Sequence, residues 1–95
     1  MQREFVLQTL RSYNQEMSTR YGVTRLGIFG SVARDQATDA SDVDIVVEMP
    51  PDLFQMVHLK EDLEQILAVP VDLVRYHKNL NTFLKSRIDC EAIYV

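Results

Sequence analysis

Apolar residues recur at steps of three and four positions in three segments of the chain, which is the spacing of an amphipathic helix. The first predicted helix covers residues 3–20 and is followed by a stop signal at Gly22. A second begins after Asp52, a residue suited to cap it, and cannot continue past Pro70. We expect the stripes of these helices and of a last helix around 80–88 to be buried: Phe5, Val6, Leu10, Tyr13, Met17, Met56, Leu59, Leu63, Ile66, Leu67, Leu80, Phe83, Leu84 and Ile88.

Short apolar runs between the predicted helices indicate buried strands. They cover residues 26–29, 43–47 and 71–74, and residues 92–95 are predicted as a last edge strand. A short helix is expected over 32–36, with Ser31 as its cap, and a polar loop up to residue 41. Short strands joined by helices predict the α/β (α+β) class, with one small central sheet flanked by helices.

Composition and charge narrow the class of protein. A chain of 95 residues has room for one domain, which we expect to cover 1–95. It is 46% apolar and 25% charged, without an apolar run near the ~20 residues of a membrane span, so we expect a soluble protein. The first residues show no secretory leader, and a single cysteine, Cys90, fits the cytoplasm. The net charge of −4 argues against stable nucleic-acid binding, but it is compatible with a small anion brought in by a metal.

Three aspartates are the strongest candidates for chemistry. Asp42 and Asp44 are two positions apart at a strand, so their side chains leave the same face of the sheet. Asp72 is the one polar residue of the run 71–74, and it joins them if the two strands are neighbours. Such oxygen ligands select magnesium or manganese, and three carboxylates suit two ions about 3.5–4 Å apart. The alternative for Asp42 and Asp44 is a solvated strand end. The alternative for Asp72 is a structural acid that pairs with a neighbouring arginine.

A second group of residues lies at the predicted turn after the first strand. Gly30 lets a phosphate approach the main chain, and Ser31 at a helix start would offer its hydroxyl and free N–H groups. Arg34 follows one turn later and would contact phosphate or pair with an acid such as Asp35 or Asp39. An ordinary helix start remains the alternative reading of this turn.

Taken together, these residues resemble a known family. Gly30-Ser31, ten residues, Asp42-x-Asp44 and a later strand aspartate resemble the nucleotidyltransferase superfamily of DNA polymerase beta. Gly-Ser-x-Ala-Arg with Ser-Asp-x-Asp-Ile is closest to its small prokaryotic branch, the MNT-domain antitoxins of MntA type. The resemblance implies a mixed sheet, Mg²⁺ and ATP. Many members have glycine where this chain has Asp35, which leaves that turn open. The implied roles are metal binding and catalysis for Asp42, Asp44 and Asp72, and nucleotide binding for Gly30, Ser31, Arg34 and Ser41.

The resemblance also implies a function. It is the transfer of AMP from ATP to a tyrosine hydroxyl of a HEPN-domain ribonuclease, the toxin of a toxin-antitoxin pair. The alternatives are an antitoxin that acts by docking alone and a transferase acting on a small molecule. The base preference, the number of AMP units, homo- or hetero-oligomer formation and the role of residues 75–78 stay open.

Overall fold

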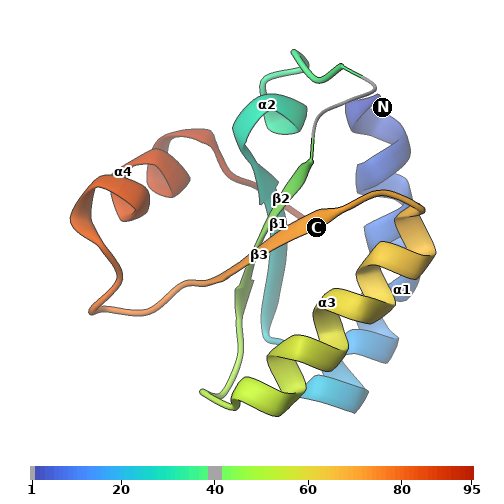
Figure 1. Cartoon of the computed structure of the whole chain (residues 1–95), viewed down its shortest axis with the longest axis vertical. Coiled ribbons are helices and arrows are strands. Elements are labelled where there is room, and N and C mark those ends of the chain that lie inside the picture. Colours follow the sequence, from blue (N-terminus) through green and yellow to red (C-terminus); the bar gives the residue numbers. More distant parts are fainter. Residues whose placement is uncertain (1, 39–41) are drawn as a thin grey trace.

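The chain folds as a mixed sheet with helices on both faces (Figure 1). This computed structural model describes residues 2–38 and 42–95. The predicted α/β class, with a small central sheet flanked by helices, is confirmed. The elements in chain order are α1 (Arg3–Tyr21), β1 (Arg25–Phe29), α2 (Gly30–Ala33), β2 (Val43–Glu48), α3 (Leu53–Leu67), β3 (Val71–Arg75), α4 (Thr82–Glu91) and β4 (Ile93–Tyr94).

The strands of the described ranges form one four-stranded sheet in the order β3-β2-β1-β4. β1 is antiparallel to both of its neighbours, β2 and β4, whereas β2 and β3 are parallel. A parallel pair needs a crossover between its strands, and α3 provides it. Because the two strands begin at the same end of the sheet, residues near their starts are brought side by side.

The main core lies between the sheet and helices α1 and α3. Alternate residues of β2, namely Val43, Ile45 and Val47, are buried on this face, as the strand pattern predicts. Asp52 caps α3 as expected, because its side chain accepts a hydrogen bond from the Gln55 N–H at 3.1 Å. The other residues of β2 therefore face the opposite side of the sheet.

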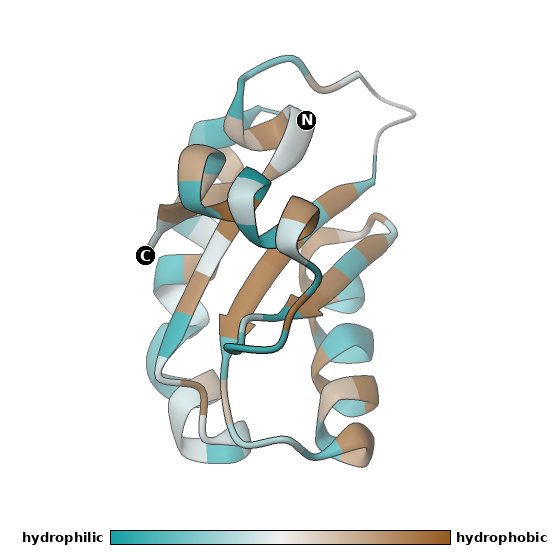
Figure 2. Cartoon of the chain, turned by 90° about the vertical axis from the view of Figure 1, so that its left-hand side faces the viewer, coloured by the Kyte–Doolittle hydropathy of each residue, from teal (hydrophilic) through white to brown (hydrophobic). Residues whose placement is uncertain are grey.

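That opposite side is covered by α4, which packs on a smaller apolar cluster. Its buried members are Phe29, Val46 and Ile88. Figure 2, viewed from this side, shows brown strands behind helices that carry both teal and brown segments. In the part of the chain that the structure describes, no helix is long and apolar enough to cross a membrane.

Three aromatic residues predicted to be buried are on the surface instead. Phe5 is 54% exposed, Phe83 is 74% exposed and Tyr13 is also exposed. In α1 the buried face is centred on Val6 and Leu10, so its neighbour Phe5 is turned about 100° away from the core. In the first turn of α4, Leu84 is the residue that packs against the cluster on the sheet, and its neighbour Phe83 is turned away from it. Met56 is partly buried and packs against the main core.

Candidate active site

Two of the predicted acids lie side by side at the start of the parallel strands. Asp44 of β2 is the register partner of Asp72 of β3, and such partners project from the same face. That face is the one covered by α4, since Val46 and Val74, two residues further along each strand, pack in its cluster. Asp42 is exposed and directly precedes β2. The sequence predicted that Asp72 joins the other two acids if their strands are neighbours. The strands are neighbours, and Asp72 lies beside Asp44.

The electrostatics of Asp44 reflect this crowding. Partial burial raises the pKa of Asp44 above its ordinary value, and the negative charge of Asp72 raises it further. The positive charge of Arg87, on α4, lowers the pKa, and the charge of Asp42 adds a smaller increase. Two carboxylates that repel each other in this way would both be stabilised by a cation placed between them.

The donor set fits a hard divalent cation. Mg²⁺ commonly takes one or two carboxylates together with phosphate oxygens of its substrate, and Asp44 and Asp72 supply such a pair. Among residues 2–38 and 42–95, no three His, Cys, Asp or Glu side chains are gathered closely enough to hold a metal ion. A site with all three aspartates as ligands therefore stays a prediction.

Gly30 directly follows β1, and its main chain lies against the Asp44 carboxylate. It has φ +74°, in the left-handed region, and a Cβ atom at this position would lie 2.1 Å from Oδ2 of Asp44. Glycine is therefore favoured at this position both by the backbone conformation and by the close approach of the carboxylate. The predicted helix over 32–36 is wrong in its bounds, because α2 already begins at Gly30. Phe29 occupies the N-cap position, so Ser31 is not the cap but lies within the helix.

The turn after α2 explains the departure from the family pattern. Asp35 has φ +60°, which is the left-handed conformation that glycine adopts without strain. Aspartate is one of the few other residues that visit this region. This chain therefore has an aspartate, with some conformational strain, at a turn position whose backbone suits glycine.

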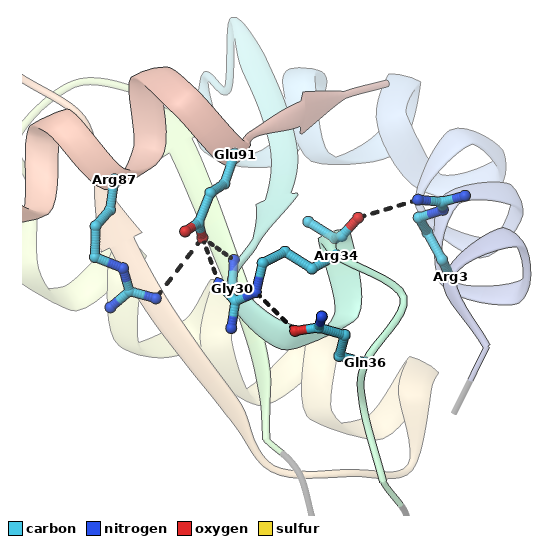
Figure 3. Close-up of polar contacts among 7 residues, drawn as sticks. Arg3, Gly30, Arg34, Gln36, Arg87 and Glu91 are labelled. Atoms are coloured by element: carbon cyan, nitrogen blue, oxygen red, sulfur yellow. Dashed lines mark hydrogen bonds and ion pairs between the residues drawn. The ribbon is translucent and has the colours of Figure 1, made fainter.

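The partners of Arg34 differ from the phosphate or the nearby aspartates expected from the sequence. Its Nη1 donates to Oε1 of Glu91 at 2.9 Å, and its Nε donates to Oε1 of Gln36 at 3.2 Å (Figure 3). Glu91 also accepts a hydrogen bond from the Gly30 N–H at 3.1 Å. Free N–H groups were expected at this helix start, and this one already has a partner within the chain. The sequence indicates no role for Glu91 or for Arg87, because nothing in the residues around them links them to the distant segment 30–44.

The remaining candidates divide clearly. Ser41 and Asp39 lie outside the described residues. In the segment 75–78, Arg75 donates to the main-chain oxygen of Met49 at 3.5 Å, and the Tyr76 hydroxyl donates to Asp89 at 2.8 Å. These two side chains therefore have structural partners, and they lie at the end of β3 that is away from Asp44 and Asp72.

Comparison with known proteins defines the class. The family described as nucleotidyltransferase domain matches residues 10–95, so the chain belongs to this family and is a nucleotidyltransferase. Within the family it is similar to the protein adenylyltransferase MntA of Thermococcus cleftensis, with 35% identity over 94 residues, 97% of this chain and 94% of that protein. The resemblance to minimal, MntA-type members is thus confirmed.

Solved structures agree with this placement. A structure assigned as a minimal nucleotidyltransferase matches 98% of this chain and 95% of its own, with TM-score 0.79 and 35% identity. A toxin-antitoxin crystal structure with AMP-PNP matches 99% of this chain and 72% of its own, with TM-score 0.70 and 21% identity. The second similarity is one of fold.

Proposed function

We propose that this protein is the antitoxin of a toxin-antitoxin pair and transfers AMP from ATP to a hydroxyl of its partner. The partner would be a HEPN-domain ribonuclease and the acceptor a tyrosine. The observation that carries the proposal is the register pairing of Asp44 with Asp72 beside the Gly30 turn. Support comes from the similar protein adenylyltransferase MntA, and from the shared fold of the toxin-antitoxin structure that contains AMP-PNP.

The site residues divide into two groups by chemistry. Gly30, Ser31 and Arg34, with Ser41 as a further prediction, would bind the phosphates of ATP. Asp42, Asp44 and Asp72 would hold one or two Mg²⁺ ions, which supply positive charge next to the phosphates when bound. Asp72 is exposed on the outer strand β3, so an acceptor hydroxyl can reach its carboxylate.

The transfer needs no reactant other than ATP and the acceptor hydroxyl. The acceptor oxygen attacks the α-phosphorus of ATP, the bond from that phosphorus to the bridging oxygen breaks, and pyrophosphate leaves with the electron pair. Asp72 accepts the proton of the attacking hydroxyl as general base. The enzyme contributes positioning and charge neutralisation, which are the main sources of rate in phosphoryl-type transfers.

The test is transfer to the partner in solution. The protein is mixed with the candidate toxin, ATP and MgCl₂, and the toxin is weighed by intact mass spectrometry. We expect a mass gain of one or more AMP units, located on tyrosine by peptide analysis. A folded, nucleotide-binding protein that leaves the toxin unmodified would contradict the transferase proposal, and modification of an aminoglycoside by the chain alone would favour a small-molecule acceptor.

Charge-neutral variants separate catalysis from docking. Asp42→Asn combined with Asp44→Asn should abolish transfer and release the toxin from neutralisation in cells. Glu61→Gln, which changes an exposed carboxylate on α3, is the matched control and should behave as wild type. Neutralisation by the double variant at equal abundance would show that docking is sufficient.

A measurement without turnover tests the metal assignment. MgCl₂ should raise the melting temperature of the wild-type chain, because ions that bind the folded state stabilise it by mass action. The Asp44→Asn variant should show little or no such rise. An equal rise in both proteins would remove Asp44 from the metal site.

A further inference from the structure

We propose that Glu91 is a positioning residue for nucleotide binding, which holds the Arg34 guanidinium and the Gly30 peptide in place from the end of α4. This inference rests on the proposed function, since it assumes that the Gly30–Arg34 segment receives the phosphates of ATP. It adds a residue that lies outside the sequence motif and on another element of the fold.

The geometry converges on one oxygen atom. Oε1 of Glu91 accepts from the Gly30 N–H at 3.1 Å and from Nη1 of Arg34 at 2.9 Å, and it lies 3.7 Å from Nη2 of Arg87 (Figure 3). The Glu91 side chain is 21% exposed, so these contacts are partly shielded from water. Charge-assisted hydrogen bonds in such surroundings are stronger than those of an open surface pair.

Both ends of the contact are held by further bonds. Arg34 is bound on its other side by Gln36, which limits the many rotamers of a free arginine. The main-chain oxygen of Ala33, the preceding residue, accepts from Nη1 of Arg3 at 3.2 Å (Figure 3). The segment from Gly30 to Gln36 is therefore tied to α4 on one side and to α1 on the other.

Arg87 extends the same row of charges toward the acids. It is one turn before Glu91 on α4, and its positive charge acts on Asp44. Positive and negative groups thus alternate from Arg34 through Glu91 and Arg87 to Asp44. Removing the Glu91 charge would leave two arginines without their shared partner next to the phosphate-binding segment, free to take other orientations.

The first experiment measures binding of ATP with Mg²⁺ by isothermal titration calorimetry, together with kcat and KM for transfer. Glu91→Ala should weaken binding and raise the KM for ATP by about 10-fold, while kcat changes much less, because the loss is one of ground-state positioning. Glu91→Gln keeps an oxygen acceptor for the Gly30 N–H and should lose less. Glu48→Gln, which removes the charge from the Arg25 ion pair at the far end of β2, is the matched control.

A double-mutant cycle then tests the route through Arg34. If Glu91 acts through Arg34, adding Glu91→Ala to Arg34→Ala should weaken ATP binding by less than about 3-fold more. A full 10-fold further loss would overturn the inference, as would wild-type ATP affinity in a folded Glu91→Ala variant. Failure of the wild-type chain to bind ATP at all would instead refute the proposed function, and this inference with it.

Discussion

Replacement of Gly30 by alanine tests the close approach of the main chain to the catalytic acids. The left-handed conformation at φ +74° costs an L-residue about 1–2 kcal/mol, of which the stiffer unfolded chain returns about 0.4–1 kcal/mol. The new Cβ would lie 2.1 Å from Oδ2 of Asp44, so the carboxylate must leave its rotamer at a further cost of about 1 kcal/mol. We expect a total loss of about 2 kcal/mol of unfolding free energy.

The same change should affect activity far more than stability. Moving the Asp44 carboxylate by about 1 Å at a site that works by positioning costs roughly 100-fold in rate. Unfolding is followed in urea by circular dichroism, and AMP transfer is measured at saturating ATP and Mg²⁺ under conditions where the variant is folded. The two readouts together show whether the chain lost its fold or only the arrangement of its site.

Gly22→Ala is the matched control. Gly22 has nearly the same conformation, φ +71°, but its added Cβ would meet Cδ of Pro50 at 3.2 Å, far from the acids in the fold. We expect it to lose about 1 kcal/mol of stability and to keep full activity. If Gly30→Ala were as active as Gly22→Ala, the reasoning that links the Gly30 turn to the placement of Asp44 would be refuted.

Three further predictions concern residues that affect the stability of the fold. Ala68 ends α3 at φ +59°, so Ala68→Gly should stabilise the protein by about 0.5–1 kcal/mol in urea unfolding, and a loss of stability would argue against that conformation. Asp52→Ala removes the acceptor for the Gln55 N–H and should cost about 1 kcal/mol with unchanged transfer, whereas Asp52→Ser should restore most of it. The Glu64 carboxylate accepts from the Val71 N–H at 2.9 Å, and this bond lowers the pKa of Glu64 below its ordinary 4.5. Its contribution is therefore present above pH 4.5 and is lost as the pH falls through the lowered value, so wild type and Glu64→Gln should differ most near neutral pH and converge in acid; a constant difference would contradict this.

Much of the local structure followed from neighbouring residues. The strands, the cap at Asp52 and the inward side of β2 are set by apolar spacing and by side-chain bonds within a few positions, which the sequence displays directly. The segment from Gly30 to Asp44 likewise carries its own chemistry, and this was sufficient to indicate the nucleotidyltransferase family. In these cases the residues that cause the local structure and the sequence pattern that predicts it lie in the same stretch of chain.

Tertiary structure decided what depends on distant parts of the chain meeting. The parallel register of β2 and β3 placed Asp72 beside Asp44, and the return of α4 brought Glu91 to Gly30 and Arg34. The face that α1 packs on the sheet is centred on Val6 and Leu10, which leaves Phe5 on the surface although its spacing suits a core position. Periodicity fixes the residues that share a face, but only packing against other elements determines which face is covered and which charges become neighbours.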